Sequence, residues 1–287
     1  MNKIKVIVDS TVDVPLEKLK EHDVDMLPLY VNIHGEEYRD LEEIKWDELI
    51  SKVEKYDELP KTSAVTVETF YNTFNKYASK GYDVIFLSLG SNFSCNYSNA
   101  VTAASMIEGN IYVIDSKNLS SAIGLQLLKI LKMKEEGLEA KEIVEKMADI
   151  IENTQTETGL ETVEYLHKGG RCSGVARIFA NILKLYPIVK IKEGLIKVHK
   201  ISKFKFKNAL DKIISDFKKD VDEGNVDEDH IIISTVGNKK AQNYLFKKIS
   251  EFFNPLKILL FDAGCVVSTH CGPGTTGLFY IRKRKLA

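Results

Sequence analysis

Four short segments of this chain carry side chains that could bind an anion. Thr62-Ser63 and Ser94 offer hydroxyl groups, and Lys168-Gly169-Gly170-Arg171 joins two glycines to a guanidinium group. Two glycines let the backbone approach a ligand closely, and a guanidinium binds a carboxylate or a phosphate through two parallel hydrogen bonds. His270 precedes the residues Cys-Gly-Pro-Gly, which predict a rigid turn that holds the imidazole at a fixed position. These residue types favour the binding of a small anionic group.

Each of these segments also has a purely structural interpretation. Thr62-Ser63, expected in a short loop before a helix, could form an ordinary turn or helix cap, and Gly169-Gly170 could end a helix and leave Arg171 on the surface. A serine hydrolase is a further alternative, with Ser94 as the nucleophile and His270 as the general base. No Gly-x-Ser-x-Gly sequence surrounds Ser94, and no acidic residue is obviously placed to orient His270, so we favour a binding site.

The first half of the chain alternates β-branched segments with segments of helical periodicity. Strands separated by helices predict right-handed crossovers and a parallel sheet covered on both faces, which is a three-layer α/β/α arrangement. The predicted strands span residues 4–8, 84–87 and 111–114, and the predicted helices span residues 67–79, 121–136 and 140–152.

Polar residues follow the three predicted strands of this sheet. They are Asp9-Ser10-Thr11, the segment 90–94 and Asp115-Ser116. Open parallel sheets bind ligands at the carboxyl ends of their strands, because helix N-termini and loop N–H groups point there. Asp9 and Asp115 are expected to hold loops in place, because a carboxylate would repel an anionic ligand.

The polar segment Asn153–Thr158 interrupts the helical periodicity, and we predict a domain boundary there, with domains of residues 1–153 and 154–287. The second domain is predicted to be a two-layer α/β unit with a mixed sheet and helices on one face. Lys203–Lys207 alternates lysine with phenylalanine, as a strand with a basic face would. The remaining predicted elements are a hairpin at 187–198, helices at 208–219 and 239–253, and strands at 231–235, 258–261 and 277–282.

Composition narrows the class of protein. The 287 residues include 40 Lys and Arg against 41 Asp and Glu, a formal net charge of -1, so we expect no nucleic-acid partner. The apolar segments are far shorter than the ~20 residues that span a bilayer, and the N-terminus lacks the pattern of a secretion signal, so a cytoplasmic protein is expected. The basic residues 282–285 are compatible with at most a transient contact with a membrane surface.

The four cysteines form no CxxC pair, so free thiols and no metal site are expected.

Several ordered motifs make the chain resemble the DegV family, the fatty-acid-binding subunits of bacterial fatty acid kinase. The resemblance covers nearly the whole length of the chain. The motifs that carry it are Val8–Thr11, Leu27–Val31 followed by Gly35 and Tyr38, Thr62-Ser63, Ser91–Ala100, Val113–Ser116, Tyr165–Arg171 and His270–Gly274.

The resemblance implies a parallel-sheet domain, a mixed-sheet domain and a long-chain fatty acid buried in a tunnel near their interface. The carboxylate would be held by Thr62, Ser94 and nearby backbone amides, while His270 and Arg171 would lie near the head group and assist phosphoryl transfer. A partner fatty acid kinase would supply ATP and Mg²⁺, an acceptor enzyme would take the acyl phosphate, and this chain would have no cofactor and no catalysis of its own. The neighbouring residues Ser63, Cys95, Asn96, Gly169, Gly170 and Cys271 complete the expected ligand-binding set.

The chain departs from the family pattern beside the expected head-group site. The Ser-Gly-Thr-Tyr of the family reads here Ser94-Cys95-Asn96-Tyr97, and Cys172 and Cys271 adjoin Arg171 and His270. One interpretation is a small soft side chain that packs a narrow site, since a buried free cysteine behaves as a small hydrophobe. The other is a thiol-sensitive or metal-capturing site, which would require a lowered thiol pKa. The departures also leave open a binder of another small carboxylate.

Overall fold

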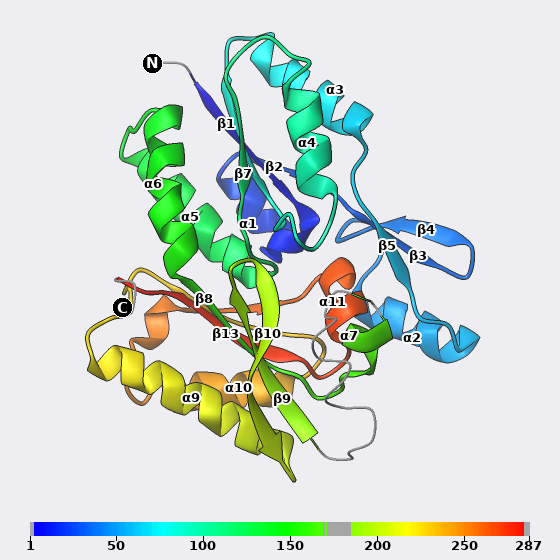
Figure 1. Ribbon diagram of the computed structural model, residues 1–287, viewed down its shortest axis with the longest axis vertical. Helices are drawn as coiled ribbons and strands as arrows, with labels where there is room; N and C mark the ends of the chain where they lie inside the picture. The colour runs from blue at the N-terminus through cyan, green and yellow to red at the C-terminus, as the bar shows by residue number, and fades with distance from the viewer. Residues whose placement is uncertain (1–2, 169, 171–184, 284–287) are drawn as a thin grey trace.

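The computed structural model describes residues 3–168, 170 and 185–283, in which two main sheets are joined through a shared helix layer (Figure 1). The first sheet is entirely parallel, with the strand order β2-β1-β6-β7. The central strands β1 and β6 are buried on both faces, which is typical of a parallel sheet covered by helices. The strands are β1 (Ile4–Asp9), β2 (Val24–Leu27), β6 (Asp83–Ser88) and β7 (Ile111–Asp115).

Helices cover both faces of this sheet and form the predicted three layers. Figure 1 shows α3 and α4 on one face and α5 and α6 on the other. Within the described residues, no helix is both long and apolar enough to cross a membrane. The helices are α1 (Leu16–Glu21), α3 (Val67–Ala78), α4 (Asn96–Ala104), α5 (Ser121–Glu135) and α6 (Ala140–Asn153).

The second sheet is mixed, with the strand order β10-β9-β8-β13-β11-β12 and a parallel pair at β11 and β12. Helices α9 and α10 pack on one face, so the predicted fold class is confirmed. Its strands and helices are β8 (Thr154–Gly159), β9 (Leu185–Lys192), β10 (Leu195–Lys203), α9 (Phe206–Asp222), β11 (Ile231–Thr235), α10 (Lys239–Ile249), β12 (Ile258–Asp262) and β13 (Thr276–Ile281).

Helix α5 is the layer that joins the two sheets. It contacts β6 of the parallel sheet and β8, β11 and β13 of the mixed sheet. Its buried residues include Ile123, Leu127 and Ile130, and they surround the helix on several sides, as a helix between two apolar surfaces requires. Ile232 and Phe279 of the mixed sheet therefore belong to the same apolar core as β1 and β6.

The polar segment expected to mark a domain boundary is a central strand of the mixed sheet. β8 pairs with β9 on one side and with β13 on the other. Its Glu157 is fully buried, lies 2.6 Å from Lys190 Nζ and accepts a hydrogen bond from Tyr280. Because these partners compensate for the buried charge, the polarity of residues 154–158 does not indicate a loop here. The division between residues 153 and 154 stays a prediction; it falls where α6 ends and β8 begins.

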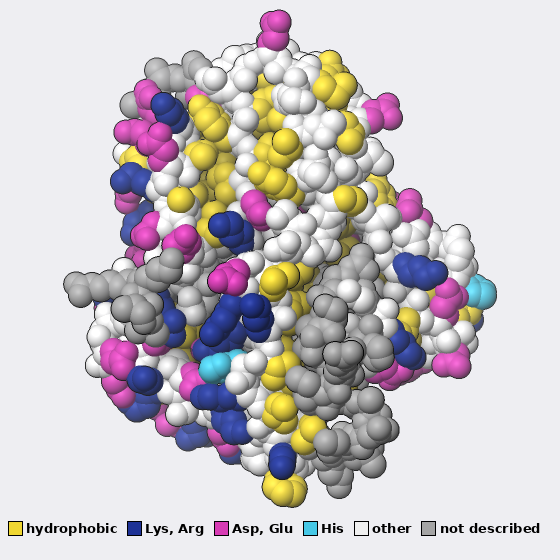
Figure 2. Space-filling model, in the orientation of Figure 1, with side chains coloured by type: hydrophobic (Ala, Val, Ile, Leu, Met, Phe, Trp, Pro, Cys, Tyr) yellow, Lys and Arg dark blue, Asp and Glu magenta, His cyan; other side chains and the backbone are white. Residues whose placement is uncertain are grey.

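The Lys203–Lys207 segment is not a strand but the junction between β10 and α9. Phe204 within it has a left-handed φ of 72° and is 77% exposed, so the alternation of faces stops where β10 ends. Figure 2 shows Lys and Arg side chains gathered on this face over the β9–β10 hairpin. Lys190 and Lys200 of that hairpin form ion pairs with Glu157 and Asp216.

A small antiparallel sheet, which we did not predict, carries Thr62-Ser63. Thr62 pairs with Val31 across this sheet, so the segment expected to be a loop is a short strand. The strand order is β4-β3-β5. Its elements are β3 (Tyr30–Ile33), β4 (Glu36–Arg39), the connecting helix α2 (Trp46–Tyr56) and β5 (Lys61–Ser63).

Candidate functional site

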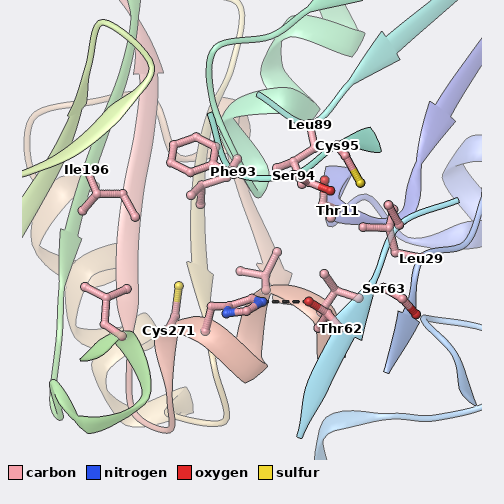
Figure 3. A pocket seen from close by; sticks show the side chains of 16 residues that line it. Thr11, Leu29, Thr62, Ser63, Leu89, Phe93, Ser94, Cys95, Ile196 and Cys271 are labelled. Carbon is pink, nitrogen blue, oxygen red and sulfur yellow. Dashed lines mark hydrogen bonds between the residues drawn. The ribbon is translucent and has the colours of Figure 1, made fainter. Parts of the chain in front are cut away.

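A cavity of about 310 Å³ lies where the parallel sheet, the small sheet and helix α11 (Cys265–Cys271) meet. Pockets for small molecules typically span ~300–1,000 Å³, so this one is at the lower end of that range. Figure 3 shows that its walls come from segments far apart in the chain. Much of the wall is apolar: Leu29, Leu89, Phe93, Leu166, Ile196 and Val267. The polar and thiol groups on it are those of Thr11, Thr62, Ser63, Ser94, Cys95, His270 and Cys271.

Thr62 and His270 meet at this cavity, with 2.9 Å between Thr62 Oγ1 and His270 Nε2 (Figure 3). The predicted rigid turn does not hold His270. The residue lies in the last turn of α11, and the turn begins after it at Gly272, where φ is 80°. In the tautomer with a proton on Nε2, the imidazole donates to Thr62, and the threonine hydroxyl hydrogen is left for a ligand.

Ser94 lies in the loop between β6 and α4, on the wall of the cavity. Its Oγ accepts a hydrogen bond of 3.2 Å from the backbone N–H of Asn96. A hydroxyl that accepts one hydrogen bond keeps its own hydrogen for another partner, so Ser94 can donate to a carboxylate. The N-terminus of α4 begins two residues later, and its partial positive charge favours an anion at the same place.

Asn96, predicted to bind the ligand, instead lies behind the cavity wall, where it connects two backbone segments of the site. Its side chain is fully buried and is not part of the cavity wall. Its Nδ2 donates to Asp9 at 2.9 Å, and its Oδ1 accepts from the N–H of Val65 at 3.2 Å. Asn96 thus ties the segment after Thr62-Ser63 to the end of β1, and both of its amide groups are occupied.

Asp9 and Asp115 hold loops, as predicted. Asp9 accepts hydrogen bonds from the backbone of Thr11 at 3.1 Å and of Leu89 at 2.7 Å, and burial raises its pKa. Asp115 accepts from the backbone of Ser91 at 3.0 Å and of Lys117 at 2.9 Å. Both carboxylates therefore shape the loop that leads to Ser94 without facing the cavity.

Two buried aspartates hold the beginning of α11, and sequence analysis missed both. Asp13 Oδ1 accepts from the N–H of Gly264 at 2.8 Å, and Asp40 Oδ1 accepts from the N–H of Cys265 at 2.7 Å. Burial raises the pKa of Asp13 to about 8 and that of Asp40 to about 6. An isolated aspartate gives no local signal of such a role; only the proximity of Asp13 to the Asp-Ser-Thr motif could have drawn attention to it.

The cysteines of the site differ in their surroundings. Cys95 is exposed and Cys271 is partly exposed, and both line the cavity. Burial of the thiol group raises the pKa of Cys271 to about 12, which is opposite to the lowered pKa that a thiol-sensitive site requires. Within the described chain, no three His, Cys, Asp or Glu side chains are grouped so that they could hold a metal ion.

The structure describes one residue of the Gly-Gly-Arg loop, Gly170. Gly170 is exposed, has a left-handed φ of 68° and does not line the cavity. Gly169, Arg171 and Cys172 lie outside the described residues. The apolar lining residues, such as Phe93, Leu166 and Ile196, were also missed, because apolar side chains that line a ligand cavity look like core residues in the sequence.

Comparison with known proteins identifies the family. A family model described as "Uncharacterised protein, DegV family" matches residues 3–283. The chain belongs to the DegV family. A DegV domain-containing protein of Clostridium acetobutylicum is 31% identical over 284 residues, which cover 99% of this chain and 100% of that protein.

Solved DegV structures share the fold of this chain. A DegV family protein from Thermus thermophilus, described as fatty acid binding, has a TM-score of 0.89 at 26% identity, with 98% of this chain and 99% of that chain covered. A protein from Eubacterium ventriosum, described as stearic acid-binding, has a TM-score of 0.86 at 27% identity, with 99% of each chain covered. The predicted family resemblance is therefore confirmed.

In this DegV chain the cavity combines two kinds of wall. The hydroxyl groups of Thr62 and Ser94 can donate hydrogen bonds to an acidic oxygen, with His270 hydrogen-bonded to Thr62, and the aliphatic and aromatic side chains can enclose a hydrocarbon. None of the described lining residues is Lys or Arg. The arrangement therefore suits an amphiphile with a single small polar end.

Proposed function

We propose that this chain binds a long-chain fatty acid, with the carboxylate near Thr62, Ser94 and His270 and the acyl chain against the apolar wall. The observation that carries the proposal is the meeting of these three polar side chains at one mostly apolar cavity. The descriptions of the Thermus thermophilus and Eubacterium ventriosum proteins as binding fatty acids support the same ligand class.

Burial of the acyl chain should supply most of the binding free energy, and hydrogen bonds to the carboxylate should fix its position. Burying about sixteen carbons at ~0.8 kcal/mol per methylene contributes roughly 10 kcal/mol before the costs of association are subtracted. A hydrogen bond to a charged group adds about 1.5–3 kcal/mol. Loss of one hydroxyl should therefore disturb the placement of the carboxylate more than the retention of the lipid.

We further propose that the chain is a non-catalytic carrier that presents its fatty acid to a partner kinase. The kinase would supply ATP and Mg²⁺, and the acyl phosphate would pass to an acceptor enzyme. The exposure of Ser63 and Cys95 supports this role, because it leaves the polar part of the cavity accessible from the surface. Arg171 and His270 would assist the transfer.

The first test is native mass spectrometry of freshly purified protein, followed by extraction and identification of the bound molecule. A co-purified long-chain fatty acid is expected. A non-lipid carboxylate in the protein would overturn the proposal in favour of another small-carboxylate binder. An esterase assay tests the alternative of a serine hydrolase. Ester hydrolysis that disappears in Ser94→Ala would establish a catalytic serine.

The carrier role needs a separate test with the partner kinase. Ser94→Ala should lower the rate of acyl-phosphate formation more than it lowers fatty acid retention, because the hydroxyl positions the head group. Equal losses of phosphoryl transfer and of fatty acid retention would contradict the idea that the hydroxyl positions the carboxylate while the acyl chain supplies the affinity.

A further inference from the structure

Three residues of the mixed sheet form a small polar row on the face that is turned toward α5 and α11. Thr158 of β8, Gly277 of β13 and Ser234 of β11 are direct neighbours, because Gly277 pairs with Thr158 on one side and with Ser234 on the other. Gly277 leaves the middle of this row without a side chain. A Cβ atom there would lie 2.7 Å from Thr158 Oγ1 and 2.9 Å from the ring of Phe279, so the site does not accept a larger residue without rearrangement.

A cavity of about 20 Å³ lies over this row, and we call it the Ser234 niche. Ser234 is 3% exposed, and its Oγ has no hydrogen-bond partner among the described residues. Buried hydroxyl groups normally have a hydrogen-bond partner, so an unpartnered one that lines a cavity indicates that a polar atom can bind there. The niche exceeds the ~10–15 Å³ that one water molecule needs, which is also room for a single oxygen substituent.

The Ser234 niche adjoins the fatty acid cavity. Leu119, Val267 and Cys271 line both spaces, so a single layer of side chains separates them. The cavity wall is apolar at Leu119 and Val267, and the niche behind it is lined by the unpartnered hydroxyl of Ser234. Joining the niche to the cavity requires a change of rotamer at Leu119 or Cys271, whose side chains, unlike that of Val267, are not β-branched.

We propose that the Ser234 niche accepts the oxygen of a hydroxyl or keto group on the acyl chain, so that this protein prefers oxygenated long-chain fatty acids. The inference rests on the proposed fatty acid function and specifies its ligand. The guest oxygen accepts or donates a hydrogen bond with Ser234 Oγ, with Thr158 Oγ1 beside it. An unsubstituted chain leaves Ser234 without this partner.

The test compares stearate with hydroxystearates that carry the hydroxyl group at successive carbons, by displacement of a fluorescent fatty acid from delipidated protein. One isomer or a few neighbouring isomers should bind at least about fivefold more tightly than stearate, the gain expected of one buried hydrogen bond. Ser234→Ala should remove that preference and leave stearate affinity within about twofold. Thr158→Val should reduce the preference, because it alters the same row.

Ser202→Ala is the matched control. Ser202 is also a buried strand serine whose Oγ has no partner among the described residues, but it lies on β10 and lines neither cavity. This variant should keep the preference of the wild type. Equal binding of all isomers, or a preference that survives in Ser234→Ala, would show that the niche holds water only and would overturn the inference. Failure of stearate and every hydroxystearate to bind would overturn the proposed function itself.

Discussion

Asp13 accepts a hydrogen bond of 2.8 Å from the backbone N–H of Gly264, although 251 residues separate the two positions. Asp40 makes the corresponding contact with Cys265. The two bonds come from Gly264, the N-cap of α11, and from Cys265, its first residue, and His270 lies on the last turn of that helix. The position of the imidazole at the cavity therefore depends on two carboxyl groups buried in the other half of the chain.

The free energy of unfolding should decrease as the pH rises from about 6 to about 8, because of Asp13. Its pKa is raised to about 8 in the folded protein, well above the ~3.9 of an unfolded aspartate, so in this interval the folded state keeps a proton that the unfolded state has released. The slope attributable to one such group reaches up to about 1.4 kcal/mol per pH unit. The contribution of Asp40 is confined to lower pH, because its folded pKa is about 6.

Urea denaturation of the wild type and of Asp13→Asn at pH 6, 7 and 8 checks this expectation. The amide can still accept from Gly264, and it cannot titrate, so the variant should lose the slope. Other titrating groups are common to both proteins and cancel in the difference. Parallel curves for the two proteins would show that Asp13 does not hold a proton in the folded state.

Head-group recognition should depend on the hydroxyls of Thr62 and Ser94. Thr62→Val and Ser94→Ala should each weaken binding of a free fatty acid by about tenfold or more, as expected for a hydrogen bond to a charged group. The methyl ester of the same acid carries no charge, so its affinity should change by less than threefold or so. Competition binding with the acid and the ester measures both values. A variant that loses acid and ester equally would indicate damage to the apolar cavity instead.

Bound fatty acid should protect particular thiols from alkylation. Cys95 is exposed on the cavity wall and should react first, while the raised pKa of Cys271 leaves little thiolate at neutral pH and makes its reaction slow. A ligand in the cavity should slow both reactions. Cys265 is buried and lies outside the cavity wall, so it serves as the internal control and should react slowly with or without ligand. Peptide mass spectrometry after timed labelling gives the rates, and unprotected Cys95 and Cys271 in the loaded protein would place the ligand elsewhere.

Lys190→Met should destabilise the mixed sheet strongly. The substitution leaves Glu157 buried without its cation, which costs about 3–5 kcal/mol in comparable buried pairs. Burial already raises the pKa of Glu157, so the loss should shrink toward acidic pH, where the carboxyl group takes up a proton.

Lys197→Met on the neighbouring strand is the control for this prediction. Lys197 pairs with Glu193 at 3.8 Å, and both side chains are largely exposed, so its loss should cost less than about 1 kcal/mol. Chemical denaturation of both variants gives the comparison. Similar costs for Lys190 and Lys197 would mean that the buried pair contributes no more than a surface pair.

Elements with a local apolar repeat could be predicted from the sequence. The segments at Val84–Leu87 and Ile231–Thr235 are strands, and the helical periodicity after residue 120 became α5. The order of these elements along the chain then determined the parallel sheet, because strand-helix-strand units have few possible arrangements. Motifs also identified Thr62, Ser94, His270 and Cys271, which the structure places on one cavity.

Asn96 is a residue whose role could not be predicted from its sequence motif. It belongs to the same motif as Ser94, but it is the first residue of α4, and its side chain reaches Asp9 and Val65 rather than the cavity. Neighbours in a motif can therefore differ in role, because the backbone direction at a helix N-terminus sends their side chains to different places.

The sequence by itself determined the periodic elements, the fold class and the types of several polar residues that line the cavity. Only the tertiary structure decided that the polar segment at Thr154 is a central strand, that His270 lies on a helix held by Asp13 and Asp40, and that Ser234 faces a niche beside the cavity. The physical reason is that a buried charge or hydroxyl is stable only with a suitable partner. In this protein such partners come from distant parts of the chain, as Lys190 does for Glu157.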